Sequence, residues 1–371
     1  MICFNDVVKV YDNGTRAVDG LSLTAPTGQI TVLVGPSGCG KTTSLRMINR
    51  MVRPTSGSIQ IDGEDVSTLD PTDLRRRMGY VIQSGGLFPH RTVLDNITTV
   101  PRLLGTGRRQ ARGDALELLE RVGLDASLAR RYPRQLSGGQ QQRVGVARAL
   151  AADPPVMLMD EPFSAVDPQV REQLQDEFLH LQADLGKTIV LVTHDIDEAI
   201  RLGDQIAVLR VGGTLAQQDS PDRLLAGPSD DFVAAFLGHD RGYRGLAFAP
   251  APDLPTHQES TVTLGAPHDG AVTAAGGDPW LLVVDDAASP LGWIRPSETG
   301  ARVGRNDLHL GGTLAELGGP APGSGSLRAM LDAALSSPSR RGVVVDRDHR
   351  LLGTVRAADV LAAIETGGQR P

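Results

Sequence analysis

The sequence predicts an α/β fold with an inserted helical subdomain, followed by a small α+β domain. Through the first two-thirds of the chain, short and continuously apolar runs alternate with amphipathic helical segments. Strands that are buried on both faces of a mostly parallel sheet have this appearance. Residues from about 84 to 152 are helical in tendency and contain no clear strand, which predicts the insertion. Beyond residue 246 the composition changes, and a strand–turn–strand pattern occurs twice, which predicts the second domain.

The core strands are predicted from three apolar runs, at 30–34, 156–159 and 188–192. Between the last two runs lies a helical segment with apolar residues on one face, namely Val170, Leu174, Phe178, Leu181 and Leu185. A strand–helix–strand order of this kind connects parallel strands by a right-handed crossover. We therefore expect an α/β core built from these runs.

Composition limits the class of protein. A chain of 371 residues exceeds what one hydrophobic core usually serves, so two domains are expected. The formal charge of -7 and the pI near 5.6 argue against a nucleic-acid partner that is held by broad phosphate neutralisation. Cys3 and Cys39 lie far apart, which argues against a disulfide framework and suits a reducing cytosol. No segment has the pattern of a signal peptide or the ~20 apolar residues that span a bilayer, so we expect any membrane process to need a separate partner.

A phosphate-binding loop is predicted between the strand that ends at Val34 and the helical run 43–51. Its residues match the pattern G-x-x-x-x-G-K-[ST] and are Gly35, Pro36, Ser37, Gly38, Cys39, Gly40, Lys41 and Thr42. Glycines let the backbone N–H groups curl around phosphates, and the next helix, which opens at Thr43, adds its positive dipole end. Lys41 is expected to reach the β- and γ-phosphates of a nucleoside triphosphate, and the Thr42 hydroxyl to bind Mg²⁺.

A second motif narrows the class. The residues Leu136, Ser137, Gly138, Gly139 and Gln140 stand before a predicted helix that contains Arg143. This segment resembles the signature of ATP-binding-cassette (ABC) proteins, and the resemblance covers about residues 1–240. The α/β domain is therefore expected to be an ABC ATPase cassette, with its helical subdomain at about 84–152.

The resemblance implies roles for further residues. Asp160 and Glu161 directly follow the apolar run 156–159, and together with it they match the Walker B motif. In this motif the first acid holds Mg²⁺ and the second is the general base. Gln83 matches the Q-loop, which contacts Mg²⁺ or water, and His194 matches the switch histidine. Residues 164–167 match the D-loop. Tyr11 matches the aromatic residue that stacks on adenine.

The resemblance also implies partners that one chain does not supply. In this family the signature of one cassette binds the γ-phosphate held by the phosphate loop of another, so a homodimer of cassettes is expected. Transmembrane permease subunits turn the motion of the dimer into transport, and an extracytoplasmic solute-binding protein joins through the complex. The chain is therefore expected at the cytoplasmic face of the inner membrane, as a peripheral subunit.

Three segments resemble importer ATPases for the osmoprotectants glycine betaine, carnitine, choline and proline: 80–90, 159–168 and 231–242. An importer of another solute, such as an amino acid or an oxyanion, stays an alternative, because this subunit does not touch the solute. A soluble ABC ATPase that acts mechanically on nucleic acid or ribosomes is an alternative of another class. Family members that act on ribosomes usually join two cassettes in one chain, and those that act on DNA split the cassette with a long coiled coil. The sequence shows neither feature, which disfavours this alternative.

The C-terminal third is expected to hold a linker at 241–257 and a degenerate pair of CBS-like repeats at 258–371. CBS sites usually place Ser or Thr three residues before a ribose-binding Asp. The second repeat has Arg356 in that place before Asp359, and the first has Arg295 before Glu298. Adenosine binding is therefore in doubt, and three alternatives remain open. The arginines could bind a phosphate or an anionic lipid, they could form surface salt bridges, or the domain could dimerise without a ligand. We expect this region to modulate the ATPase.

Overall fold

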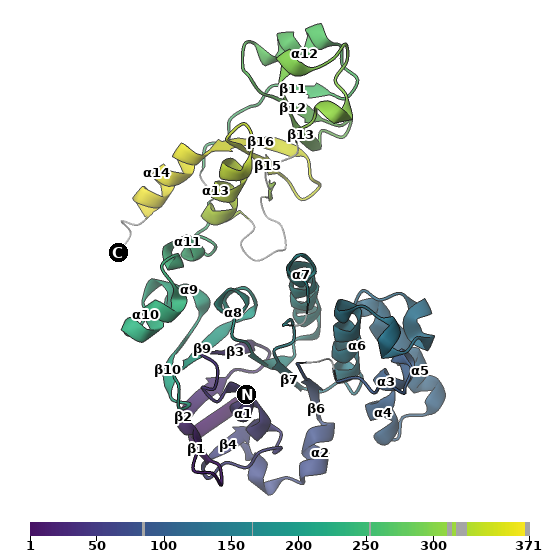
Figure 1. Ribbon diagram of the computed structural model, residues 1–371, viewed down its shortest axis with the longest axis vertical. Helices are drawn as coiled ribbons and strands as arrows, with labels where there is room; N and C mark the ends of the chain where they lie inside the picture. Colours follow the sequence, from purple (N-terminus) through teal and green to yellow (C-terminus); the bar gives the residue numbers. More distant parts are fainter. Residues whose placement is uncertain (84–85, 165, 252–253, 310–313, 317–324, 368–371) are drawn as a thin grey trace. The chain divides into compact units, whose positions relative to one another are not determined.

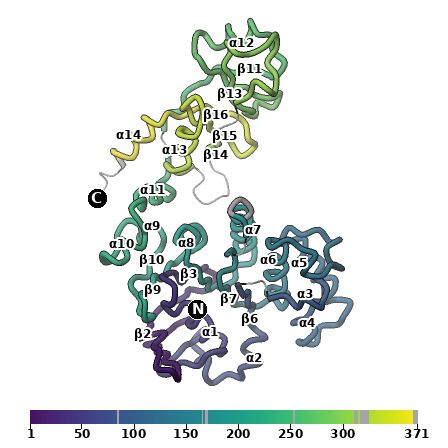
Figure 2. The backbone as a smooth tube through the Cα atoms, viewed as in Figure 1, coloured from purple at the N-terminus to yellow at the C-terminus, as the bar shows by residue number. Residues whose placement is uncertain are grey.

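The computed structural model describes residues 1–371 except 84–85, 165, 252–253, 310–313, 317–324 and 368–371 (Figure 1). Ser84, Gly85 and Ala165, which belong to predicted motifs, lie outside the described residues, as does the side chain of Val170. The chain divides into two compact units, Met1–His239 and Asp240–Pro371. The smooth backbone trace in Figure 2 follows the chain through each unit.

The first unit is built on a six-stranded sheet with the order β10-β9-β3-β8-β7-β6. Its strands are β3 (Ile30–Val34), β6 (Met78–Val81), β7 (Val156–Asp160), β8 (Thr188–Val192), β9 (Gln205–Leu209) and β10 (Leu215–Asp219). All neighbouring strands are parallel except the edge pair of β9 and β10. Strands β3, β7 and β8 are buried at every residue, which explains their continuously apolar sequences. The predicted α/β core is confirmed.

A second sheet, which the sequence analysis did not predict, lies in the same unit. It has the order β2-β1-β4-β5 and consists of β1 (Ile2–Val10), β2 (Arg16–Ala25), β4 (Ser56–Ile61) and β5 (Glu64–Asp65). Helix α1 (Lys41–Ile48) packs in the hydrophobic core that this sheet shares with one face of the parallel sheet. Alternate residues of the parallel strands point to the opposite face, where they meet the helices of the unit.

Those helices are α7 (Pro168–Leu185), α8 (Ile196–Leu202), α9 (Pro221–Ala226), α10 (Asp231–Leu237) and the inserted helical group. The group contains α3 (Val93–Ile97), α4 (Thr99–Leu103), α5 (Arg108–Arg121) and α6 (Gly138–Leu150), and it lies to one side of the sheets in Figure 1. No strand occurs among its described residues, 86–152, as predicted. A short helix, α2 (Pro71–Arg76), precedes β6.

The second unit contains two copies of one topology. The first copy is β11 (Thr261–Thr263), α12 (His268–Ala275), β12 (Leu281–Val284) and β13 (Pro290–Ile294). The second is β14 (Ala315–Glu316), α13 (Leu327–Ser336), β15 (Arg341–Val345) and β16 (Leu351–Arg356), followed by α14 (Ala357–Gly367). In each copy the first two strands are parallel and the last two antiparallel. The sequence analysis predicted the strand pair of each copy but not α12, whose small residues give a weak amphipathic pattern.

The two copies also share the details of their turns. Asp285 accepts hydrogen bonds from the N–H groups of Ala287 and Ser289 in the first turn. Asp346 accepts from Asp348 and Arg350 in the second turn. A hydrophobic cluster then joins the two sheets, and its buried members are Leu282, Val284, Trp293, Val343 and Val345. The internal repeat is therefore structural, with its own core.

Residues 241–257, which we expected to be a linker, are partly folded onto this unit. Helix α11 (Arg241–Gly245) begins the segment, and the Tyr243 hydroxyl donates a hydrogen bond to Asp332 on α13. Ala251 is buried in the hydrophobic core around α13 and donates its N–H to Gly325 O at 2.9 Å. The alanine and proline content suggested a free linker, but Ala251 is buried and Ala249 is partly buried against this core, whereas Pro250 and Pro255 are exposed.

Candidate functional site

The predicted phosphate loop connects β3 to α1, and two of its glycines have no room for a side chain. Gly35 and Gly40 have φ angles of 155° and 90°. A Cβ at Gly35 would lie 2.3 Å from Leu209 O, and one at Gly40 would lie 2.2 Å from Ala17 O. Only glycine at these two positions lets the loop pack this closely against the neighbouring strands. Lys41 is 7 % exposed, and its ammonium group donates hydrogen bonds to Gly35 O at 2.7 Å and Pro36 O at 3.0 Å.

The ends of β3, β7 and β8 bring the other predicted residues to this loop. Val192 is paired with both Leu33 of β3 and Asp160 of β7, so the carboxyl ends of the three strands are level. Asp160 Oδ1 accepts a hydrogen bond of 2.9 Å from the Thr42 hydroxyl. Burial raises the pKa of Asp160, and the Thr42 hydrogen bond and the Arg46 guanidinium, 4.0 Å away, oppose that shift.

Three residues were predicted to be catalytic, and Glu161 contacts the other two, Gln83 and His194. Gln83 Nε2 donates to Glu161 Oε2 at 2.7 Å, and His194 Nδ1 lies 3.2 Å from Glu161 Oε1. The residues come from the ends of β6, β7 and β8, so tertiary structure alone unites them. Glu161 has a φ of 47° and donates its N–H to Val192 O at 2.9 Å.

Two side chains that the sequence analysis missed lie directly behind His194. Thr193 is 1 % exposed and Glu198, on α8, is 7 % exposed. The Thr193 hydroxyl donates a hydrogen bond to Glu198. Burial raises the pKa of Glu198 to about 7. Nothing in the sequence distinguishes this acid from the exposed acids around it, except its place four residues after the switch histidine.

The signature residues lie apart from this cluster. Ser137 caps the N-terminus of α6, where its hydroxyl accepts the N–H of Gln140 at 3.3 Å. Ser137 and Gly138 are exposed, and α6 belongs to the helical subdomain (Figure 1). Among the described residues, no hydrogen bond or ion pair joins residues 137–140 to the phosphate loop. One chain therefore presents the signature outward.

Tyr11 lies at the edge of the phosphate loop. It is 39 % exposed, and its hydroxyl is 3.3 Å from the Thr43 hydroxyl on α1. The ammonium group of Lys9 lies 5.0 Å from its ring centroid. An exposed ring face beside the loop is available for stacking.

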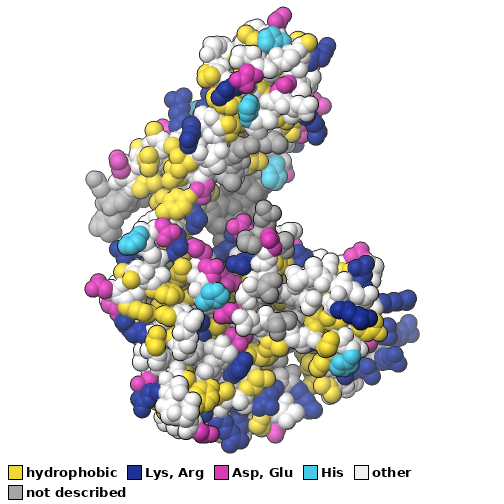
Figure 3. Space-filling view, in the orientation of Figure 1, with side chains coloured by type: hydrophobic (Ala, Val, Ile, Leu, Met, Phe, Trp, Pro, Cys, Tyr) yellow, Lys and Arg dark blue, Asp and Glu magenta, His cyan; other side chains and the backbone are white. Residues whose placement is uncertain are grey.

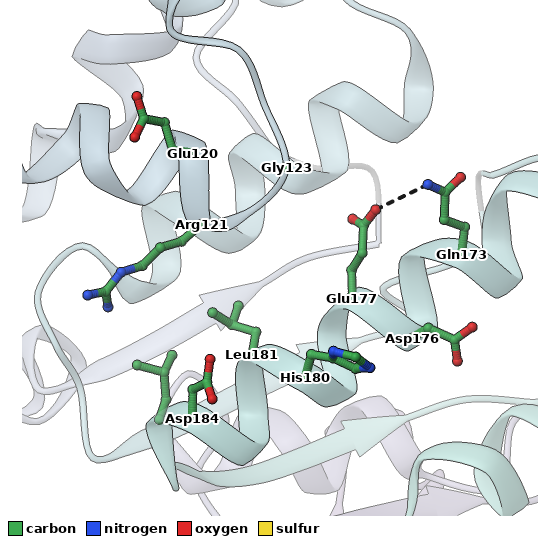
Figure 4. A pocket seen from close by; sticks show the side chains of 10 residues that line it. Glu120, Arg121, Gly123, Gln173, Asp176, Glu177, His180, Leu181 and Asp184 are labelled. Carbon is green, nitrogen blue, oxygen red and sulfur yellow. Dashed lines mark hydrogen bonds between the residues drawn. The ribbon is translucent and has the colours of Figure 1, made fainter. Parts of the chain in front are cut away.

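A cavity of about 700 Å³ lies elsewhere, between α5 and α7 (Figure 4). Four of its ten lining residues are acidic, namely Glu120, Asp176, Glu177 and Asp184. None of the predicted site residues lines it. Glu177 is paired with Arg143 at 2.7 Å, so part of this acidity supports the packing of α6 against α7.

The residues around Asp160 suit a magnesium ion that is shared with a nucleotide. Thr42, Asp160 and Gln83 offer oxygen atoms, which Mg²⁺ prefers, and Asp160 is a buried carboxyl group that a cation would stabilise. The described residues contain no cluster of three or more His, Cys, Asp or Glu side chains that could hold a metal alone. Such a site leaves most of the coordination to phosphate oxygens and water.

The fold and this site define a phosphate-loop ATPase of the ABC class. The ABC transporter family model matches residues 18–164. The chain is 44% identical over 370 residues to the osmoprotectant import ATP-binding protein OsmV of Salmonella typhimurium, covering 96% of this chain and 93% of that protein. It is 40% identical over 380 residues to the choline transport ATP-binding protein OpuBA of Bacillus subtilis, covering 97% and 95%.

Among solved structures, the dimeric structure of MJ0796, a bacterial ABC transporter cassette, matches with a TM-score of 0.54 and 36% identity. The match covers 60% of this chain and 99% of the cassette. The chain belongs to the family of ABC transporter ATP-binding proteins that includes OsmV and OpuBA. It is an ATP-binding ATPase, as the sequence predicted. In the part of the chain that the structure describes, no helix is both long and apolar enough to cross a membrane.

Proposed function

We propose that this chain hydrolyses ATP to drive the import of a small osmoprotectant, such as glycine betaine, choline, carnitine or proline, through separate permease subunits. The main support is the identity to OsmV, which extends over both units of the chain and not over the ATPase alone. OsmV is named as an import protein and OpuBA as a transport protein, which disfavours a mechanical ATPase on nucleic acid or ribosomes.

The geometry supports a division of labour in hydrolysis. The backbone N–H groups of residues 37–42 and the Lys41 ammonium group bind the phosphates of ATP. Thr42, Asp160 and Gln83 would hold Mg²⁺, which would neutralise developing charge on the phosphates. Glu161 is the general base that accepts a proton from the attacking water, with Gln83 and His194 orienting its carboxylate from either side.

Hydrolysis is proposed to need two copies of the chain. The signature residues, Ser137 to Gln140, have no hydrogen bond or ion pair with the phosphate loop of their own chain among the described residues, and Ser137 and Gly138 are exposed. In a homodimer they would bind the γ-phosphate held by the partner subunit. The matched cassette is a dimer, which supports this arrangement.

The helical subdomain is proposed to meet the permease at the cytoplasmic face of the membrane. Phe88 is 39 % exposed and lies just after the Q-loop. Residues 84–152 contain eleven arginines and five acidic residues, although the whole chain has a charge of -7. Basic side chains accordingly gather over this subdomain in Figure 3. A basic surface suits the side that faces anionic lipid headgroups. A solute-binding protein would join through the permease.

The second unit is proposed to be a degenerate CBS-like pair that modulates the ATPase. Its two copies of one topology support this proposal. At the position of the ribose-binding acid, Asp359 is paired with His257 at 2.8 Å, and Glu298 is paired with Arg295 at 3.0 Å. Because both acids already have basic partners, the geometry favours a regulatory ionic contact over adenosine binding.

Uptake in cells tests the proposal. Uptake of radiolabelled glycine betaine, choline, carnitine and proline should be measured at low and high salt, with and without the gene, and with a Lys41→Ala copy as the matched control. We expect salt-stimulated uptake of at least one solute to need the intact gene and to be lost with Lys41→Ala. Unchanged uptake of all four solutes would overturn the osmoprotectant proposal and leave another import substrate as the alternative.

A further inference from the structure

The turn that contains His194 is built around a buried carboxyl group that the proposed hydrolysis does not use. Glu198 Oε2 accepts a hydrogen bond from the Thr193 hydroxyl, directly before His194. The same hydroxyl accepts the backbone N–H of Asp195, directly after His194, at 3.0 Å. The Thr193 hydroxyl therefore bridges the turn on both sides of His194, and Glu198 fixes the direction in which it donates.

Asp195 connects this turn to the D-loop. Asp195 Oδ1 accepts the N–H groups of Asp197 and Glu198 at 2.9 and 3.3 Å, which caps α8. Its other oxygen lies 3.8 Å from Arg171 Nη1 on α7. Arg171 in turn donates to Val166 O at 3.2 Å, next to Asp167 of the D-loop. One network of polar side chains thus links the His194 turn to the segment that follows Glu161.

Burial of the polar network costs free energy. Glu198 Oε1 and Arg171 Nε are both buried without a hydrogen-bond partner among the described residues. Burial is the main cause of the raised pKa of Glu198, and Asp195 adds to the rise. The Thr193 hydroxyl, Arg171 and His194 act in the opposite direction. An apolar side chain would avoid this desolvation, so the particular contribution of Glu198 is the bond that it accepts from Thr193.

We propose that Glu198 is a positioning residue for His194 in ATP hydrolysis. Through Thr193 it holds the turn that places His194 Nδ1 3.2 Å from Glu161 Oε1. Without the acceptor, the Thr193 hydroxyl loses its fixed orientation and the turn loses its bridge. The inference rests on the proposed role of His194, and it adds to that role a buried residue that does not touch ATP.

The first test separates kcat from KM in the full-length protein. We expect Glu198→Ala and Thr193→Val each to lower kcat for ATP hydrolysis about tenfold, the effect of losing one hydrogen bond of ~1.4 kcal/mol. KM for ATP should stay within about twofold, because the phosphate loop is untouched. Thr193→Ser keeps the hydroxyl and should retain most of the activity. Glu172→Gln, which removes an exposed carboxylate on α7, is the control and should keep the wild-type kcat.

A double-mutant cycle with His194→Ala shows whether Glu198 acts through His194. If it does, Glu198→Ala should cost no further activity in the His194→Ala background, with the low rates followed by release of radiolabelled phosphate. An equal loss in both backgrounds would overturn the positioning role.

Loss of activity in His194→Ala with normal activity in Glu198→Ala and Thr193→Val would overturn this inference alone. Normal activity in His194→Ala would instead overturn the proposed role of His194 itself. Thermal unfolding of each variant checks folding, and the near-isosteric Thr193→Val provides the answer should Glu198→Ala not fold.

Discussion

At the scale of single residues, the site depends on an unusual backbone conformation at its centre. The positive φ of Glu161 costs a non-glycine residue on the order of 1–2 kcal/mol, which surrounding contacts must offset. Its N–H donates to Val192 O, and its own carbonyl accepts hydrogen bonds from the N–H and hydroxyl groups of Ser164. These bonds hold the backbone at Glu161, whose carboxylate contacts Gln83 and His194.

Glu161→Gln tests the role of this carboxylate. Glutamine has nearly the same shape but is a very poor proton acceptor, so ATP binding should persist while kcat falls at least ~100-fold. The protein should then accumulate as a dimer when ATP is added, which size-exclusion chromatography measures. Single-turnover hydrolysis measures the fall in rate. Glu172→Gln, an exposed acid on α7, should hydrolyse ATP normally. Normal hydrolysis by Glu161→Gln would remove this residue from the role of general base.

At the scale of elements, the sequence predicted what short-range patterns encode. Strands β3, β7 and β8 were visible because burial on both faces makes them continuously apolar, and the phosphate loop was visible because its glycines are needed locally. The antiparallel sheet was missed because β1 and β2 mix buried and exposed residues and contain register shifts. Glu198 was missed because burial of an acid is a tertiary property that no local pattern reveals.

Asn96 is another residue that only tertiary structure identifies, and it organises the segment proposed to meet the permease. It is fully buried on α3, where its Oδ1 accepts the N–H of Phe88 at 2.7 Å. Its Nδ2 lies 3.2, 3.2 and 2.9 Å from the carbonyl oxygens of Phe88, Arg91 and Thr92. One side chain therefore holds the whole segment 88–92 against α3.

Asn96→Ala should uncouple transport from hydrolysis. The change leaves these backbone groups without their partner, at a cost of about 1–3 kcal/mol for each group that stays buried. We expect uptake to fall at least ~10-fold while ATP hydrolysis by the isolated protein changes less than about twofold. Asn5→Ala, which removes an exposed amide from β1, is the matched control for both measurements. Equal losses of uptake and hydrolysis would contradict a role confined to coupling.

At the scale of the whole molecule, each unit has a hydrophobic core of its own. Two clusters lie entirely within the first unit and three within the second. The ABC transporter family model matches residues 18–164, which lie within the first unit, and 60% of this chain matches 99% of a solved ABC transporter cassette. We therefore expect Met1–His239 to fold and hydrolyse ATP without the second unit.

The full chain and Met1–His239 should then differ in how salt affects hydrolysis. In the second unit, partly exposed contacts between a histidine and an acid, which are ion pairs when the histidine is protonated, connect each repeat to the segment before the other repeat. His257 meets Asp359 at 2.8 Å, and His309 lies 4.0 Å from Glu298. Salt weakens exposed pairs of this kind, because the Debye length shortens to about 8 Å at 0.15 M and about 3 Å at 1 M. ATPase rates measured from low to high KCl should therefore change more steeply for the full chain than for Met1–His239.

Asp359→Asn should flatten the response of the full chain, and Asp348→Asn, in an exposed turn of the same unit, should leave it unchanged. Identical salt curves for the full chain and the truncated chain would mean that the second unit does not regulate hydrolysis through these contacts.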